Sequence, residues 1–177
     1  CDEFLSPSFA KACGLEENEF KKLAIFLAAV HDIGKAIVVF QYKIGDKLPE
    51  RKSALEASGI NFDVSYDKEK AKQTPHAFAG EEILNLLGCP ECVSTVVGSH
   101  HGVPAESVQD LSWPQKDIAV YENYYGRDKE NVEVLQDIWQ KIFDMALDYA
   151  GFLDVSELPD IDRSSQMLLS GLLIMAG

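Results

Sequence analysis

Long hydrophobic runs are missing from this sequence. The longest apolar stretch, Met167 to Ala176, is well short of the ~20 residues that a membrane-spanning helix needs. The first residues, Cys1 to Phe4, contain no basic segment followed by an apolar core, so no signal peptide is visible. An initiator Met is also absent, and we expect the natural N-terminus to lie upstream of Cys1. These absences favour a cytoplasmic protein that has no membrane contact.

Basic residues are scarce as well. Lys and Arg total 16 against 29 Asp and Glu, which gives a net charge of -13. Nucleic acid repels such a chain at long range, so a DNA or RNA substrate would need metal ions, a local basic patch or another domain to attract it. Solubility alone also explains the charge. With 177 residues, 46% of them hydrophobic, the chain has the size and composition of a single globular domain over residues 1–177.

Two motifs that would indicate other functions are incomplete. Cys89 and Cys92 form a lone CxxC, and no second CxxC completes a zinc site of four thiolates. We interpret the pair as partly buried thiols at a helix start, with half a zinc site or a redox pair as alternatives. A phosphate-binding loop of the form GxxxxGKS or GxxxxGKT does not occur, because Gly34-Lys35 lacks both the upstream glycine and the hydroxyl residue. Any use of ATP would belong to another domain.

Apolar residues recur at helical spacing along most of the chain, which predicts an all-α fold. The clearest helices are Glu16–Val30 and Asp128–Ala150. Ala36–Tyr42 is compatible with a strand, but we favour a helix, and further helices are predicted over 50–58, 74–87, 90–101 and 164–176. The aromatic residues between Trp113 and Tyr125 are interpreted as core. The apolar face predicted for the long helix consists of Val132, Leu135, Trp139, Ile142, Phe143, Ala146 and Tyr149.

Histidine is rare, yet its four occurrences follow a recognisable order. His31 precedes Asp32, His76 opens a predicted helix, and His100 and His101 are adjacent. A neutral imidazole is the commonest metal ligand in proteins. Adjacent side chains on a helix point about 100° apart, so His100 and His101 can reach one site only where the backbone leaves the helix. The sequence predicts that the helix ends at these residues. Chance scatter into core and surface is the weaker interpretation, and the order predicts a metal site.

The residue types suit phosphodiester hydrolysis. Metal ions acidify bound water and polarise phosphate, and two ions about 3.5–4 Å apart clamp the attacking and leaving oxygens. The two oxygens of Asp32 make it the natural bridge between the two ions. His76, His100 and His101 would complete the coordination of one ion, and His31 would bind the other. Imidazole-rich sites suit Mn, Fe, Co, Ni or Zn better than Mg.

Lys35 is the candidate for contact with substrate. It follows His31 by four residues, so on a continued helix the two side chains would share a face. An ammonium group there would bind substrate phosphate or stabilise charge in the transition state, which makes Lys35 a catalytic candidate beside Asp32. A solvated lysine without function is the alternative.

These motifs resemble the HD superfamily of metal-dependent phosphohydrolases. Within it, the segment His31–Ala36 with Phe40-Gln41 is similar to the HD-Gly-Lys-Ala…Phe-Gln segment of the nuclease domain of the CRISPR-associated helicase-nuclease of type I systems. The alanine-rich segment after His76 and the double histidine before Gly102 also resemble that family, as do Leu5–Ser8 and the apolar end of the chain.

The resemblance implies an HD-domain helical bundle that cuts single-stranded DNA with two metal ions in type I interference. It implies two partners: a superfamily 2 helicase domain in the same full-length protein, absent from these residues, and an RNA-guided surveillance complex. The alternatives are an HD phosphohydrolase of nucleotides or cyclic dinucleotides, and a catalytically impaired interaction domain.

The chain departs from the family pattern at two points. The family has a further histidine upstream of the HD pair, and here none precedes His31. It also has an aspartate after the last apolar helix, where this chain reads Ala176-Gly177. We therefore expect the domain to lack its first and last few motif residues, and to bind one ion well and the other poorly.

Overall fold

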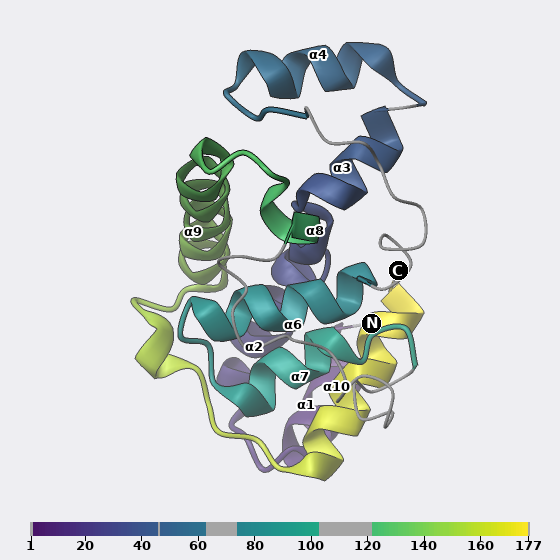
Figure 1. Cartoon of the computed structure of the whole chain (residues 1–177). Coiled ribbons are helices and arrows are strands. Elements are labelled where there is room, and N and C mark those ends of the chain that lie inside the picture. Colours follow the sequence, from purple (N-terminus) through teal and green to yellow (C-terminus); the bar gives the residue numbers. More distant parts are fainter. Residues whose placement is uncertain (1, 46, 63–73, 103–121, 177) are drawn as a thin grey trace.

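A computed structural model describes residues 2–45, 47–62, 74–102 and 122–176 (Figure 1). Over these ranges the chain is helical and contains no strand, which confirms the predicted all-α fold. The predictions that concern residues 63–73 and 103–121, including Trp113, lie outside the described residues. The helices are α1 (Asp2–Ala12), α2 (Glu17–Val30), α3 (Val38–Gly45), α4 (Pro49–Ala57), α6 (His76–Leu86), α7 (Glu91–Gly98), α8 (Glu122–Tyr125), α9 (Glu130–Ala150) and α10 (Arg163–Ala176), with short 3-10 turns η1 (Ile33–Lys35) and η4 (Val155–Glu157).

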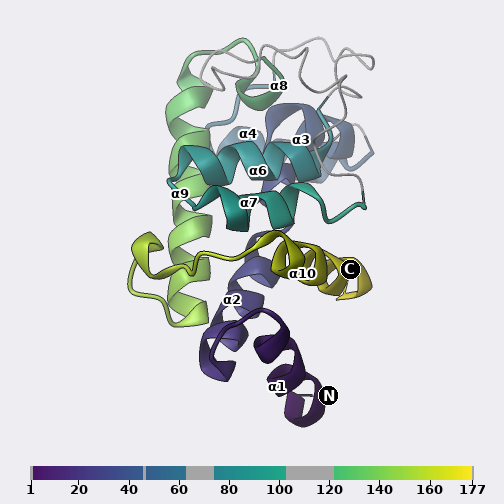
Figure 2. The same cartoon turned by 90° about the horizontal axis from the view of Figure 1, so that it is seen from below.

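The bundle is organised around two pairs of helices. The long helix α9 packs on α2, and α6 packs on α7, so that α6 and α7 lie side by side in both views (Figures 1 and 2). The turn η1 rests on α6, and α10 packs on α7. This arrangement brings the end of α2, the start of α6 and the end of α7 toward one another.

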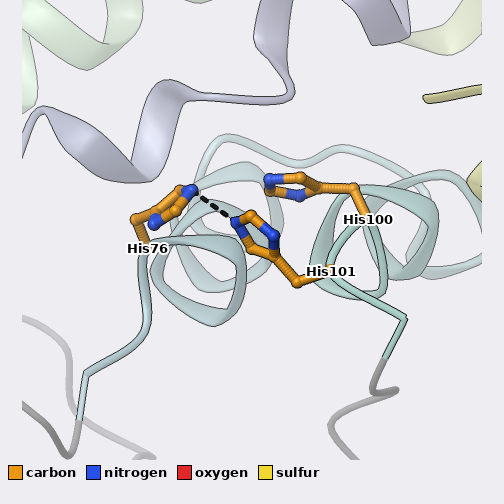
Figure 3. Close-up of side chains that lie close together, drawn as sticks. All are labelled: His76, His100 and His101. Atoms are coloured by element: carbon orange, nitrogen blue, oxygen red, sulfur yellow. Dashed lines mark hydrogen bonds between the residues drawn. The ribbon is translucent and has the colours of Figure 1, made fainter. Parts of the chain in front are cut away.

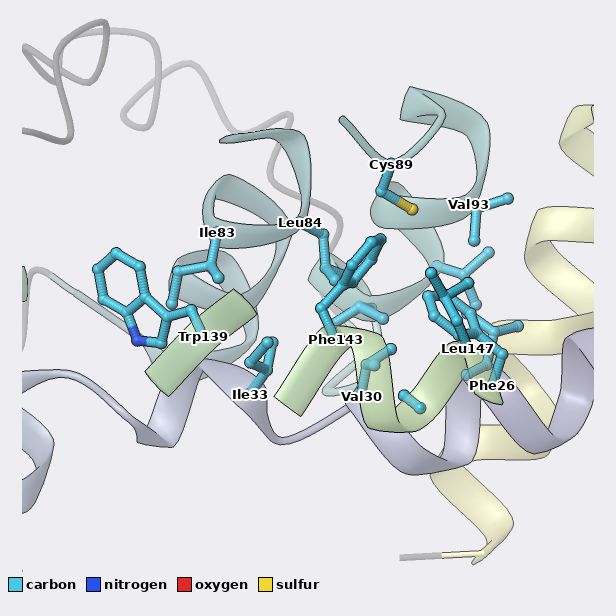
Figure 4. Packing of buried hydrophobic residues seen from close by; sticks show 14 of the residues in the cluster. Phe26, Val30, Ile33, Ile83, Leu84, Cys89, Val93, Trp139, Phe143 and Leu147 are labelled. Atoms are coloured by element: carbon cyan, nitrogen blue, oxygen red, sulfur yellow. The ribbon is translucent and has the colours of Figure 1, made fainter. Parts of the chain in front are cut away.

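Large apolar side chains from these helices fill the space between them (Figure 4). Phe26 of α2 meets Phe143 of α9 edge-on, with ring centroids 5.7 Å apart. Burial of each large apolar side chain contributes about 1.5–3 kcal/mol to stability, so this core is what holds the helix ends in place. The labelled core residues in Figure 4 are Phe26, Val30, Ile33, Ile83, Leu84, Cys89, Val93, Trp139, Phe143 and Leu147.

The predicted helices are confirmed with small changes at their ends. The helix predicted over 74–87 corresponds to α6, and Gly88 follows it with a φ of +81°, a conformation that favours glycine. The helix begins slightly later than predicted: Pro75 stands at the cap position, and the Thr74 hydroxyl accepts a hydrogen bond from Asn123 Nδ2 at 2.5 Å. Helix α1 has no counterpart in the sequence-based prediction, and it contains Pro7.

The aromatic residues divide between core and surface. Tyr124 and Tyr125 are buried against Trp139, as the core interpretation predicted. Tyr149 was expected on the apolar face of the long helix, but its side chain is 80% exposed, because the face of α9 that packs on the core runs through Phe143, Ala146 and Ala150 instead.

No single helix in the described ranges is long and apolar enough to cross a membrane, although the bent pair Glu17–Lys35 and Val38–Gly45 reaches the required length and composition.

Candidate metal centre

Three helix ends meet at one place. His31 is the residue that ends α2, and Asp32 leads into η1. His76 is the first residue of α6, while His100 and His101 lie in the turn after α7. Figure 3 shows the rings of the last three gathered at the ends of α6 and α7. The structure therefore brings together all five residues that the sequence analysis proposed as ligands.

His76, His100 and His101, the inner histidines, each offer one ring nitrogen, and these nitrogens lie within 4.8 Å of one another. The Nε2 atoms of His76 and His101 are 2.8 Å apart. Two imidazole nitrogens bound at ~2.1 Å to one ion are roughly 3.0–3.4 Å apart, so little movement would let them share a cation. No other group of three His, Cys, Asp or Glu side chains in the described ranges is arranged in this way.

Asp32 presents its two carboxylate oxygens to different neighbours. Oδ1 lies 3.4 Å from His76 Nε2, on the side of the inner histidines. Oδ2 lies 3.4 Å from His31 Nε2 and accepts a hydrogen bond from Lys35 Nζ at 2.6 Å. Burial by itself would raise the pKa of Asp32, but the hydrogen bond from Lys35, the charge of Lys35 and the charge that a protonated His31 would carry outweigh it, so this pKa is lowered. The carboxylate is ionised at neutral pH and faces two potential cation positions.

Backbone carbonyls set the tautomer of two histidines. His100 Nδ1 lies 2.6 Å from the Val97 carbonyl oxygen, and His31 Nδ1 lies 2.8 Å from that of Ala28. Because a carbonyl oxygen can only accept, Nδ1 carries the hydrogen and donates in both neutral rings. Nε2 of each ring then keeps its lone pair, which is the state that a metal ligand requires.

Burial also favours the neutral form of the inner histidines. Desolvation, together with the positive charge that His101 would carry, lowers the pKa of His76 to about 4. Desolvation likewise lowers the pKa of His100, although its hydrogen bond to Val97 favours the protonated ring. Both imidazoles are therefore neutral at pH 7 and able to bind a cation.

Close backbone contact positions Asp32 against α6. A Cβ atom added at Gly34 would lie 1.8 Å from the His76 carbonyl oxygen and 2.5 Å from the Gly80 nitrogen, so only glycine fits there. The turn that carries Asp32 thus rests directly on the first turn of α6. The Phe40 ring packs edge-on to the His76 ring, with centroids 5.5 Å apart, and supports its orientation.

Two side chains hold the backbone that follows Asp32. Gln41 Nε2 donates a hydrogen bond to the Lys35 carbonyl oxygen at 2.7 Å. Trp139 Nε1, from α9, donates to the Ala36 carbonyl oxygen, also at 2.7 Å. Neither residue was predicted to have a supporting role. The Phe-Gln segment after the HD pair was a signal for Gln41, whereas Trp139 looked like any other core residue on the stripe of α9.

Two further sequence-based expectations about side chains can be compared with the structure. The chain does not continue as an α-helix from His31 to Lys35 but turns into η1, and Lys35 contacts Asp32. The interpretation of the cysteine pair as partly buried thiols before a helix is confirmed: Cys89 is buried, Cys92 is half-buried, and both are free thiols at the start of α7. Burial raises the pKa of Cys89 to about 12.

Comparison with known proteins adds a family to this geometry. The family model described as "Cas3, HD domain" matches residues 1–177. The CRISPR-associated nuclease/helicase Cas3 of Streptococcus thermophilus is 37% identical over 169 residues, which cover 90% of this chain and 18% of that protein. The chain therefore spans less than a fifth of the length of this curated relative. A crystal structure of a CRISPR-associated protein superposes with a TM-score of 0.46 at 16% identity, over 97% of this chain and 22% of the other, a likeness too weak to carry an argument.

Proposed function

Because the chain belongs to the HD-domain family of Cas3, we propose that it is a metal-dependent nuclease domain that hydrolyses phosphodiester bonds of single-stranded DNA in type I CRISPR interference. The observation that carries this proposal is the meeting of three imidazoles and an ionised carboxylate, drawn from the ends of three helices. Such a set of nitrogen and oxygen donors suits a divalent cation.

The inner histidines and Asp32 Oδ1 are the proposed ligands of one ion, and His31 with Asp32 Oδ2 those of a second ion. Bound there, divalent ions would supply an acidified water and polarise the scissile phosphate. His31 and His100 hold their Nδ1 hydrogens on backbone carbonyls and so keep Nε2 free to coordinate. Lys35, whose side chain is 40% exposed beside Asp32, is the residue we propose to bind substrate phosphate.

The donor set also bears on the metal. Among these ligands nitrogen predominates, since four imidazoles face a single carboxylate. Nitrogen ligands favour Mn, Fe, Co, Ni or Zn over Mg, which prefers oxygen. We propose two such ions in the intact family domain, with the ion at the inner histidines bound more tightly in this chain.

The partners proposed for this domain follow from its relative and its charge. The Streptococcus thermophilus protein is a nuclease/helicase, so we propose that a superfamily 2 helicase domain of the same full-length protein feeds DNA to this site. A net charge of -13 opposes unaided capture of DNA, which favours delivery by a partner. We also propose that an RNA-guided surveillance complex recruits the domain to DNA in the cytoplasm.

The test is cleavage of circular single-stranded DNA by the 177-residue chain in Mn²⁺, with and without a chelator. Asp32→Asn keeps the size of the side chain and removes its charge, and we expect it to lower the rate by at least about 100-fold. Asp137→Asn is the matched control, because Asp137 is an exposed carboxylate paired with Lys141 on α9. Preferential hydrolysis of nucleotides or cyclic dinucleotides would show that these compounds are the substrate in place of DNA. Chelator-resistant cleavage would contradict the proposal.

A further inference from the structure

One oxygen of Asp32 already has a cation as its neighbour. Lys35 Nζ lies 2.6 Å from Oδ2, the same oxygen that lies 3.4 Å from His31 Nε2. On the other side, Oδ1 lies 3.4 Å from His76 Nε2, next to the other two inner histidines. The two halves of the centre therefore differ in their side chains, because an ammonium group contacts Asp32 on the His31 side and imidazoles lie on the inner side.

The position of Lys35 is set by its backbone. Its N–H donates to the Asp32 carbonyl oxygen at 2.9 Å within η1, and its own carbonyl accepts from Gln41 Nε2 at 2.7 Å. Gly34, the residue before it, rests on α6. These contacts hold the backbone of Lys35, whereas its side chain is 40% exposed and has room to move. The ammonium group is thus a tethered charge beside the carboxylate.

An ammonium group cannot be a metal ligand, and it repels a divalent ion. A divalent ion that binds both Oδ2 and His31 Nε2 would lie next to Nζ on the same oxygen, and the repulsion between the two positive charges favours departure of Nζ from Oδ2. We infer that Lys35 competes with a divalent ion for the His31 side of Asp32, so that binding of this ion and release of Lys35 toward substrate phosphate are a single exchange. This inference rests on the proposed metal-dependent function and adds an order of events to it.

The exchange links metal binding to substrate binding. While Lys35 is paired with Asp32, its charge is partly neutralised and attracts phosphate weakly. Once displaced, the ammonium group stays tethered at η1 and is free to pair with a phosphate oxygen. DNA and the ion at His31 should therefore strengthen each other's binding, since each is favoured when Lys35 leaves Asp32. The ion held by the inner histidines lies outside this exchange.

The experiment measures Mn²⁺ binding to the full 177-residue chain by calorimetry and by the Mn²⁺ electron paramagnetic resonance signal. Lys35→Met removes the charge and keeps the bulk of the side chain. In this variant the metal ion no longer competes with an exposed ion pair at Asp32 and is no longer repelled by the ammonium group. Binding of the weaker ion should therefore tighten at least about threefold, with binding of the tighter ion unchanged. Lys35→Arg keeps a cation beside Asp32 and should stay within about twofold of the wild type.

Lys141→Met is the matched control, because Lys141 Nζ contacts Asp137 Oδ2 at the same 2.6 Å on the surface of α9, and it should change neither ion. Lys35→Gln provides a second neutral variant, and thermal unfolding verifies that each variant is folded. A weaker ion whose affinity is unchanged or reduced in both neutral variants would overturn the inference while the proposed function stands. If no Mn²⁺ binds to the inner histidines of any variant, the proposed function itself fails.

Discussion

The two sides of Asp32 are built differently, although they share one carboxylate. The inner side consists of three imidazoles from α6 and the turn after α7, and the core behind them includes Ile83 and Val93. The other side, which we call the outer side, consists of His31 and Lys35, and its Asp32 carboxylate is 38% exposed. The inner side is a preformed group of imidazoles, whereas the outer side holds the positive charge of Lys35. The comparison indicates that the two proposed ions should differ in affinity and in their response to mutation.

The largest effect is expected from loss of an inner ligand. His76→Ala removes one of three imidazoles and should weaken Mn²⁺ binding at the tighter site more than ~100-fold, since loss of a supporting residue around a metal ligand alone costs 10–100-fold. His31→Ala should leave that affinity within a few-fold and weaken only the second ion. Calorimetric titration of both variants measures the difference. Equal losses in the two variants would mean that the two sides are not distinct sites.

A smaller but clear effect is expected at the contact that joins the two sides. Gly34→Ala places a Cβ against the backbone of His76 and Gly80, and the resulting overlap should lower the free energy of unfolding by about 1–3 kcal/mol or more. It should also weaken Mn²⁺ binding, because Asp32 would move away from α6. Denaturant unfolding and calorimetry measure the two effects.

Gly171→Ala is the control for this substitution. Gly171 lies inside α10, and an added Cβ would meet no atom within 4 Å. Alanine there should raise the free energy of unfolding by roughly 0.5–1 kcal/mol, because it favours the helix. If the Gly34 variant were as stable as the wild type, η1 would not rest on α6 as described.

The stability of the metal-free chain should depend on pH because of the inner histidines. The pKa of His76 is about 4 in the folded chain against 6.5 for an ordinary histidine, and the pKa of His100 is lowered too. Between pH 6.5 and pH 4 the histidines of the unfolded chain take up protons that His76 in the folded chain does not. The free energy of unfolding should therefore fall as the pH drops from 6.5 toward 4. His76→Gln should reduce this slope in thermal unfolding. A slope that this variant leaves unchanged would assign the effect to other groups.

The smallest effect is expected at the support of the outer side. Gln41→Leu removes the donor to the Lys35 carbonyl and should lower the free energy of unfolding by about 0.5–1.5 kcal/mol. Gln140→Leu is the matched control, since its exposed amide donates to the carboxylate of Asp144 on the same helix, and it should have almost no effect. Chemical unfolding distinguishes the two. Equal stability of both variants would show that the Gln41 hydrogen bond does not secure η1.

Much of the bundle could be predicted because helices leave local signals. Helices α2, α9 and α10 follow from the spacing of their apolar residues, and their ends agree with the prediction to within a few residues. Helix α1 was not predicted, and it contains Pro7, a residue that usually interrupts helices. Tyr149 was misplaced because a wide apolar stripe does not show which of its edges meets a neighbouring helix.

The sequence by itself determined the composition of this centre. The four histidines and Asp32 stand at helix ends that local patterns mark, and their residue types favour a cation site. Only the tertiary structure decided which oxygen of Asp32 faces which neighbour, that Lys35 pairs with one of them, and that Gly34 touches α6. Helix formation depends on residues a few positions apart, whereas these contacts depend on how α2, α6 and α7 approach one another, and that approach is set by the packing of the whole core.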